Sequence, residues 1–184
     1  MKTRFGAFLD HGRARLAEAL VRRRVTLGFV VAAASLSLAR PTWLSWSVGL
    51  VIACAGEALR VWAAGHLEKG REVTRSGPYR WIRHPLYAGS GIIALGVVIA
   101  AHSVPVALTG ATYIGVTIPM AILAEERFLR RTFGATYDLY QRDEAPPMFR
   151  RFSMAHARLN REHRAAAGLI GGFAILATRL LLSI

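Results

Sequence analysis

The chain has 184 residues, 53% of them hydrophobic, and a formal net charge of +13. This length allows a single domain, residues 1–184. The mean hydropathy is +0.33, and the apolar residues gather in runs between arginine-rich stretches, which indicates an integral membrane protein and excludes an ordinary soluble one. Cys54 is the only cysteine, which excludes an intramolecular disulfide and a cysteine-rich metal site. We expect no metal site.

The basic residues are distributed as membrane topology requires, and nucleic-acid binding is not needed to explain them. Of the 24 Lys and Arg residues, seven lie in residues 1–24, five in 65–85 and nine in 125–165. Alternate connections between the apolar runs are therefore basic, as the positive-inside rule predicts. We expect residues 1–24 to be a basic cytoplasmic segment with no cleaved signal. An alanine- and arginine-rich chain of this kind suits a bacterial inner membrane.

Five apolar runs predict transmembrane helices, and no strand pattern occurs among them. The first and third runs are short, since about 20 residues are needed to cross a bilayer. The third and fourth are separated only by His102 and Ser103, so they should form a helical hairpin. The expected fold is an all-α integral membrane protein with about five transmembrane helices and one interfacial amphipathic helix. The expected spans are residues 25–39, 43–64, 86–101, 104–124 and 165–183.

Small residues four positions apart let helix backbones approach closely in lipid. Three such steps predict helix contacts, although Gly and Ala are common in spans in any case. These steps are Ser90/Ala94, Ala111/Gly115 and Gly168/Gly172. The second span also carries Glu57 and Arg60, three residues apart on one helical face. Charged groups at this depth normally face a bundle interior or a wet cavity, so they predict either a structural ion pair or a wall of an active-site cavity.

Two polar clusters flank the predicted hairpin. The first, residues 75–91, packs tyrosines, arginines and a histidine directly before an apolar run. Its composition is also typical of an interfacial anchor belt. The second begins at Glu125-Glu126 and continues as a predicted amphipathic helix, on which Leu129, Phe133 and Tyr137 form a stripe. Two adjacent carboxylates at a membrane boundary are costly without a role, so the two clusters together suggest one site.

These clusters carry a resemblance to a known family. Residues 77–89 read Gly-Pro-Tyr-x-x-x-Arg-His-Pro-x-Tyr-x-Gly, and residues 125–140 read Glu-Glu-x-x-Leu-x-x-x-Phe-Gly-x-x-Tyr-x-x-Tyr. Together they resemble the isoprenylcysteine carboxyl methyltransferase family, which is related to the membrane phospholipid N-methyltransferases. Residues 59–63, Leu-Arg-Val-Trp-Ala, are also similar to its bacterial members. The resemblance covers residues 55–150, the motif-bearing core, and two ordered motifs across a hairpin are specific.

The resemblance implies a membrane methyltransferase that uses S-adenosylmethionine without a Rossmann domain. The sulfonium of this cofactor is a cation, which aromatic faces and carboxylates stabilise. His84 and Glu126 are candidates to assist catalysis if the acceptor is an amine, which must lose a proton. By motif position, the resemblance assigns the cofactor pocket to Arg71, Glu72, Val73, Thr74, Tyr79, Arg83, His84, Pro85, Leu86, Tyr87 and Glu125.

The sequence leaves the methyl acceptor open. Prenylcysteine-methylating members of the family carry an arginine four residues before the cofactor glutamate, where this chain has Ala121. The expected function is therefore methyl transfer to the carboxylate, amine or thiol of a lipophilic or membrane-associated acceptor at the cytoplasmic membrane face. The alternative is a non-catalytic membrane protein or complex subunit whose basic face binds anionic lipids.

Overall fold

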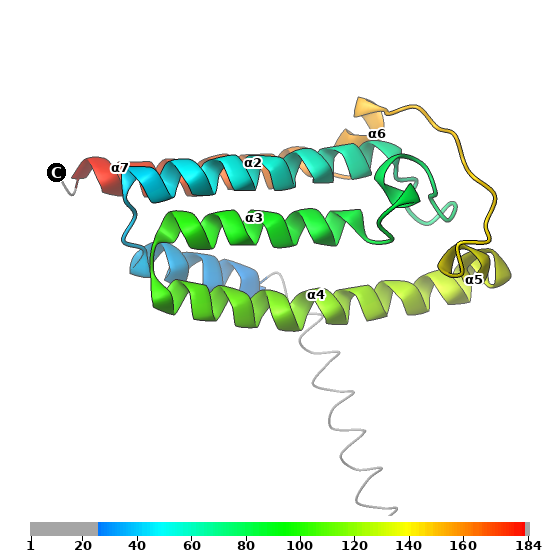
Figure 1. Cartoon of the computed structure of the whole chain (residues 1–184), viewed down its shortest axis with the longest axis horizontal. Helices are drawn as coiled ribbons and strands as arrows, with labels where there is room; N and C mark the ends of the chain where they lie inside the picture. Colours follow the sequence, from blue (N-terminus) through cyan, green and yellow to red (C-terminus); the bar gives the residue numbers. More distant parts are fainter. Residues whose placement is uncertain (1–25, 183–184) are drawn as a thin grey trace, which may run out of the picture.

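The computed structural model describes residues 26–182, which form an elongated bundle of helices without a strand (Figure 1). The basic segment 1–24 lies outside the described residues. The first described helix is Thr26–Leu38. It is followed by α2 (Trp43–His66), the 3₁₀ turn η1 (Gly77–Arg80), α3 (Pro85–Ala101), α4 (Val104–Phe133), α5 (Ala135–Gln141), α6 (Met154–Leu159) and α7 (Glu162–Leu182).

Five apolar helices lie where the sequence predicts the spans. α2, α4 and α7 are each long and apolar enough to cross a membrane, whereas Thr26–Leu38 and α3 are shorter. The hairpin between α3 and α4 turns at His102, a single residue in the left-handed backbone region with a φ of +47°. The prediction of an all-helical integral membrane protein with about five such helices is confirmed.

α4 extends beyond the span predicted for it. We expected the span to end at residue 124 and a separate polar helix to begin at Glu125, but both belong to one helix of 30 residues that stops at Gly134. At 1.5 Å per residue, Glu125 lies about 32 Å along the axis from Val104, close to the thickness of a hydrocarbon core. The two carboxylates therefore stand where the apolar part of α4 ends.

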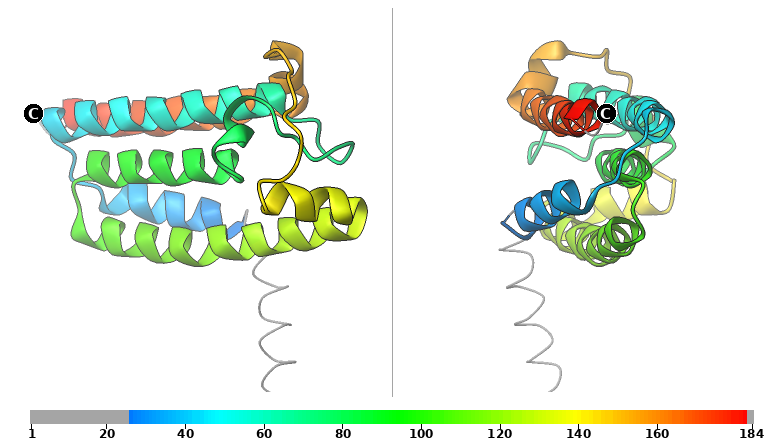
Figure 2. Two further views of the ribbon diagram at one scale, coloured as in Figure 1. Left: turned by 45° about the vertical axis from the view of Figure 1, so that its right-hand side comes forward. Right: turned by 90° about the vertical axis from the view of Figure 1, so that its left-hand side faces the viewer.

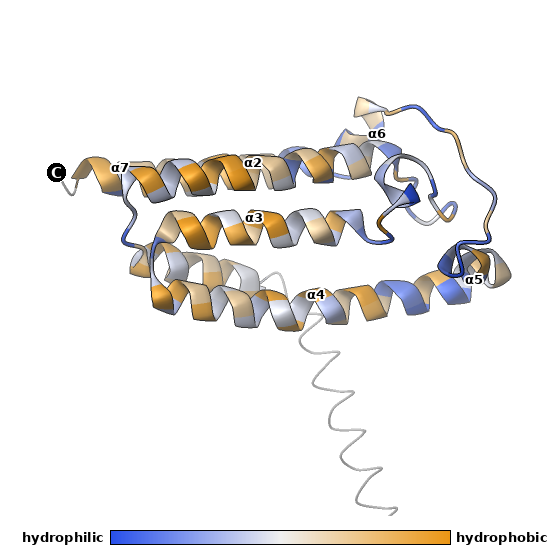
Figure 3. Ribbon diagram, viewed as in Figure 1, coloured by the Kyte–Doolittle hydropathy of each residue, from blue (hydrophilic) through white to orange (hydrophobic). Residues whose placement is uncertain are grey.

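Polar residues gather at one end of the bundle (Figure 3). This polar end holds residues 67–84, which connect α2 to α3 and which we call the motif loop. It also holds the end of α4, α5 and α6, and the connection between α5 and α6 (Figure 1). The opposite end carries a small apolar core that includes Ala53, Ala100, Val106 and Phe173.

α2 and α3 approach each other through glycines. A Cβ atom on Gly56 would lie 2.7 Å from the carbonyl oxygen of Gly89, and one on Gly96 would lie 2.7 Å from the amide nitrogen of Ala53. Such distances leave no room for a methyl group, so the two backbones are in direct contact, as small residues allow in lipid.

The small-residue steps predicted from the sequence are not where the backbones meet. A Cβ atom on Gly115, Gly168 or Gly172 would contact nothing within 4 Å, so the predicted close contacts of the two glycine-containing steps are wrong. The third step, Ser90/Ala94, borders cavities instead. The spacing of small residues along one helix identifies a face on which another helix could pack closely. Whether close packing occurs depends on the position of the neighbouring helix.

Candidate functional site

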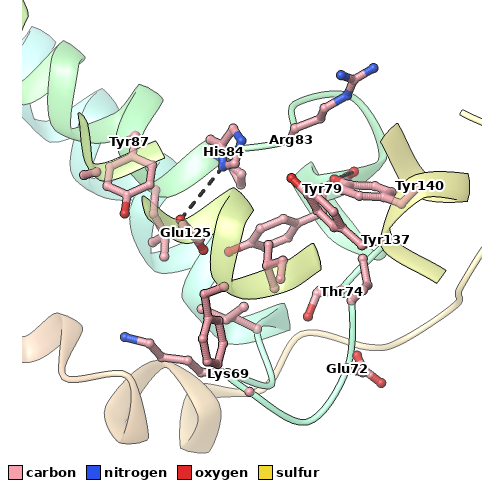
Figure 4. A pocket seen from close by; sticks show the side chains of 18 of the residues that line it. Lys69, Glu72, Thr74, Tyr79, Arg83, His84, Tyr87, Glu125, Tyr137 and Tyr140 are labelled. Atoms are coloured by element: carbon pink, nitrogen blue, oxygen red, sulfur yellow. Dashed lines mark hydrogen bonds and ion pairs between the residues drawn. The ribbon is translucent and has the colours of Figure 1, made fainter. Parts of the chain in front are cut away.

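A cavity of about 470 Å³ lies at the polar end, enclosed by the motif loop, the start of α3, α4 and α5 (Figure 4). We call it the motif cavity. Ten of the eleven predicted cofactor residues line it: Glu72, Val73, Thr74, Tyr79, Arg83, His84, Pro85, Leu86, Tyr87 and Glu125. The exception is Arg71, which is exposed in a turn at the outer side of the loop. Tyr87 and Glu125, which come from different helices, thus face one space.

The motif loop takes its shape from a glycine and a buried hydrogen bond. Gly77 has a φ of +58°, and a Cβ atom there would lie 2.6 Å from Cγ of the His66 ring, so no other residue fits. The Nδ1 atom of His66 lies 3.2 Å from Oγ of Ser76, which is buried. The chain then enters η1, with Pro78 fully buried at its start. This turn directs Tyr79 into the motif cavity.

The aromatic stripe predicted on the amphipathic helix covers the motif loop. Tyr137 and Tyr140 of α5 are buried against Val73, with Leu129 and Phe133 packed beside them. The Tyr140 hydroxyl donates a hydrogen bond of 2.8 Å to the Tyr79 carbonyl oxygen. α5 is thereby fixed to the loop that carries most of the predicted site residues.

These tyrosines, which are protonated at neutral pH in any case, hold their protons more tightly because they are buried. Burial raises the pKa of the Tyr79 phenol well above its usual value of 10, and the nearby Glu125 carboxylate adds to the effect. Burial likewise raises the pKa of Tyr137 and, to about 12, that of Tyr140. At neutral pH the three side chains are uncharged, so Tyr140 keeps the proton that it donates.

His84 stands between two carboxylates at the entrance to α3. Its Nε2 atom lies 3.2 Å from Oε1 of Glu126, and its Nδ1 atom lies 3.9 Å from Oε2 of Glu125. Glu126 does not line the motif cavity and reaches it only through this ring. The Tyr87 ring is next to the imidazole, with centroids 6.1 Å apart. The arrangement can take up a proton and stabilise a positive charge.

The outer side of the motif loop is held by Arg150, in the connection between α5 and α6. Its guanidinium pairs with both carboxylate oxygens of Glu72, at 2.9 and 3.0 Å, and donates to the His66 carbonyl oxygen at 3.2 Å. Asn160 donates to two more carbonyl oxygens at the end of α2. Glu72 therefore lines the motif cavity while already engaged in a two-point ion pair.

Arg83 and Arg60 line the cavity at different depths. Arg83 points away from the other labelled side chains (Figure 4) and lies 3.5 Å from Asp143, in an exposed pair. Arg60 lies deeper, and its guanidinium pairs with both carboxylate oxygens of Glu162 and contacts Oγ of Ser90. The predicted partner, Glu57, is 3.7 Å away and does not line the cavity. Arg60 thus serves both predicted roles, as ion-pair partner and as cavity wall.

Eleven of the residues that line the motif cavity were not among the predicted cofactor residues. Those of α4 share the helical face of Glu125 at steps of three or four residues, a signal that was present in the sequence. Those of α5 are in the second motif but were interpreted only as an amphipathic stripe. The spacing of Arg60 from Glu57 predicted a cavity wall as one of its two possible roles, whereas nothing local marked Ser90, which contacts Arg60 where α2 packs on α3. The eleven residues are Arg60, Leu67, Lys69, Gly70, Ser90, Ala121, Ala124, Phe128, Leu129, Tyr137 and Tyr140.

Comparisons with known proteins agree with the motifs. The Nickel-cobalt-cadmium resistance protein NccN of Alcaligenes xylosoxydans xylosoxydans is 32% identical over 120 residues, which are 61% of this chain and 54% of that protein. The Cobalt-zinc-cadmium resistance protein CzcN of Cupriavidus metallidurans is 29% identical over 138 residues, 71% of this chain and 63% of that protein. The chain thus spans less than two thirds of the length of either relative. No solved structure matches it.

A family model described as Phospholipid methyltransferase matches residues 29–136. The matched segment runs from the first described helix to the start of α5, and it contains the motif loop and both carboxylates of α4. It covers more than half of the chain. The protein is therefore a member of the phospholipid methyltransferase family.

Proposed function

We propose that this protein transfers the methyl group of S-adenosylmethionine to a lipophilic or membrane-associated acceptor at the cytoplasmic face of the membrane. The observation that carries the proposal is the meeting of two distant motifs, the motif loop and Glu125 of α4, on one cavity of about 470 Å³. A volume of this size suits a small-molecule cofactor. Family membership supports a methyltransferase.

The residues of the motif cavity fit the cofactor in charge and shape. The Glu125 side chain is 40% exposed, so its carboxylate is accessible to a cation, and the Tyr87 ring offers an aromatic face. Lys69, on the opposite wall, offers a positive charge for a carboxylate. When bound, S-adenosylmethionine supplies a methyl group already activated by its sulfonium. The chain's own contribution is to align the two reactants and to exclude water.

Among the three acceptor classes left open by the sequence, the charges of the site favour an amine. A carboxylate acceptor would need a cation, but position 121 is alanine, the Arg60 guanidinium is already paired with Glu162, and the charge of Lys69 is the one we assign to the carboxylate of the cofactor. Near His84 the charges are instead two carboxylates, which favour a cationic ammonium group. The imidazole, held by Glu126, is placed to accept the proton that such a group must lose before it can attack.

The metal-resistance names of the two relatives do not lead to a second proposal. Among residues 26–182, no group of three or more His, Cys, Asp or Glu side chains is placed to hold a metal ion. Glu72 and Glu126 of the site are engaged with Arg150 and His84. No observation on this chain therefore favours metal binding over methyl transfer.

Binding of S-adenosylhomocysteine to the purified protein, measured by calorimetry, tests the cofactor. We expect the wild type to bind and Glu125→Gln to weaken binding by about 10-fold or more. S-adenosylhomocysteine has no sulfonium, but its amino groups and ribose hydroxyls can donate to the Glu125 carboxylate, and a hydrogen bond to a charged group contributes about 1.5–3 kcal/mol. Arg127→Gln is the matched control, since Arg127 is exposed and outside the motif cavity. No heat of binding to the wild type would reject the proposal. The non-catalytic alternative is tested by binding of each variant to anionic lipid vesicles. It would be supported if Arg127→Gln lost vesicle binding while Glu125→Gln changed neither vesicle binding nor binding of S-adenosylhomocysteine.

A second experiment identifies the acceptor. Membranes that contain the protein are incubated with methyl-labelled S-adenosylmethionine, and the labelled product is identified by mass spectrometry. We expect an N-methylated lipid. A labelled methyl ester or thioether would keep the methyltransferase but overturn the preference for an amine.

A further inference from the structure

A second cavity, of about 410 Å³, lies further along the bundle, between Thr26–Leu38, α3, α4 and α7. In the end-on view of Figure 2, Thr26–Leu38 (blue) and α7 (red) lie on the same side of α3 (green). Apolar side chains form nearly all of its wall, and we call it the apolar cavity. Arg60 is its one charged lining residue within the described part of the chain.

The two cavities meet at Arg60 and Ser90, because both residues line both of them. The apolar cavity then follows α3 from Ser90 to Ala101, about 16 Å along the helix axis at 1.5 Å per residue. It is thus elongated, with its one charged side chain, Arg60, where it adjoins the motif cavity, and it is located among apolar helices.

Glycines keep the apolar cavity open. Gly168 and Gly172, on one face of α7, line it, and a Cβ atom on either would contact nothing within 4 Å. These are the glycines whose spacing predicted a helix contact, yet no backbone fills the space beside them. The absence of side chains at both positions leaves room for a ligand instead of a neighbouring helix.

We propose that the apolar cavity holds the hydrocarbon chain of the methyl acceptor, and that the polar head of the acceptor passes Arg60 and Ser90 into the motif cavity. This inference rests on the proposed function. A chain that moves from the bilayer into an apolar cavity changes one apolar environment for another, so it gains little from the hydrophobic effect. The apolar cavity therefore serves mainly to orient the acceptor: its hydrocarbon chain lies along α3, and its polar head points into the motif cavity beside His84.

The test compares two neighbouring glycines of α7. Gly172→Leu places a side chain in the apolar cavity, whereas Gly171→Leu is the matched control: a Cβ atom there also has open space, but Gly171 does not line the cavity. Gly168→Leu is a second variant on the lining face. The probe is a phosphatidylethanolamine with a photoactivatable diazirine at the end of one acyl chain, reconstituted with each protein in nanodiscs.

In the wild type and in Gly171→Leu, we expect the probe to label peptides from Thr26–Leu38 and α7. In Gly172→Leu and Gly168→Leu, labelling and methyl incorporation into lipid extracts should fall by at least about tenfold, as for a ligand that no longer fits its pocket. Binding of S-adenosylhomocysteine should be unchanged in all four proteins, which also reports that the variants fold.

Equal labelling of Gly172→Leu and Gly171→Leu, with cofactor binding intact, would overturn the assignment, because it would mean that the probe reports only bulk bilayer lipid. Absence of labelling in the wild type would overturn it as well, and would fit a second copy of this chain covering the opening. A wild type that does not bind S-adenosylhomocysteine would instead overturn the proposed function, whatever the labelling shows.

Discussion

Replacing Tyr140 by phenylalanine tests whether α5 holds the motif loop in place. The Tyr140 hydroxyl donates a 2.8 Å hydrogen bond to the carbonyl oxygen of Tyr79, and the Tyr140 side chain is buried, with 9% of its surface exposed. Phenylalanine keeps the ring and removes only the donor, so a buried carbonyl group loses this partner. That loss lowers the free energy of unfolding by about 1–3 kcal/mol. For a chain of this size, the melting temperature should fall by about 2–12 °C.

Thermal unfolding in detergent, followed by the fluorescence of the four tryptophans, measures this shift. Tyr137→Phe is the matched control. Tyr137 is buried in the same helix, with 1% of its surface exposed, but its hydroxyl accepts only a long 3.5 Å contact from Gln141. Its melting temperature should stay within about 2 °C of the wild type. Equal melting temperatures for the two variants would refute the reasoning, because the Tyr79 carbonyl would then not depend on the Tyr140 hydroxyl.

Three further predictions concern the loop, the helix pair and pH. Arg150→Ala should expose the motif loop to trypsin, because the loop loses its two-point ion pair. Arg151→Ala is the control, since Arg151 is the next residue and is exposed, and it should not increase cleavage. Equal cleavage rates of the two variants on a gel would contradict this prediction. Gly56→Leu should abolish the monodisperse peak in size-exclusion chromatography, because the leucine side chain would clash with the α3 backbone. Gly115→Leu, where a Cβ atom contacts nothing within 4 Å, should leave the peak intact. A monodisperse Gly56→Leu protein would disprove the close contact between α2 and α3. Burial raises the pKa of Tyr140 to about 12, so the folded protein holds this proton more tightly than the unfolded chain, with a pKa of about 10. The contribution of this raised pKa to stability is complete below pH 10 and is lost between pH 10 and 12. Over this range the melting temperature should fall more steeply in the wild type than in Tyr140→Phe. Parallel curves of melting temperature against pH would count against a raised pKa of Tyr140.

The parts of the fold that depend on local sequence could be predicted. The five apolar runs match five helices within a few residues, because an apolar stretch flanked by charged or turn residues is sufficient to define a helix in a membrane. The exception is the end of α4. Residues that favour a polar surface helix can also continue a helix that has already formed. Nothing in the sequence at Glu125 therefore ends α4, and the helix stops only at Gly134, which takes a positive φ.

The site itself was predicted unevenly, for a related reason. The motif loop and Glu125 could be located because their residues are close in sequence and follow a known pattern. Arg150 could not, because it reaches Glu72 from 78 positions away through a connection without regular structure. Arg71 does not line the motif cavity with its neighbours: it follows Gly70, whose φ is +75°, and is exposed in the turn. A one-residue change of direction at a glycine is enough to move a side chain out of a site.

Arg60 shows how far local periodicity can lead. Its spacing from Glu57 predicted an ion pair, and the two are indeed 3.7 Å apart, but this distance is too long for a hydrogen bond. Glu162, on a separate helix, can align with the guanidinium and does so at 2.9 and 3.1 Å. A buried guanidinium is stable only when such hydrogen bonds replace those of water. The partner that makes Arg60 tolerable inside the membrane is thus 102 residues away. By holding the Arg60 side chain between the two cavities, Glu162 also places the contact of Arg60 with Ser90 where both cavities begin.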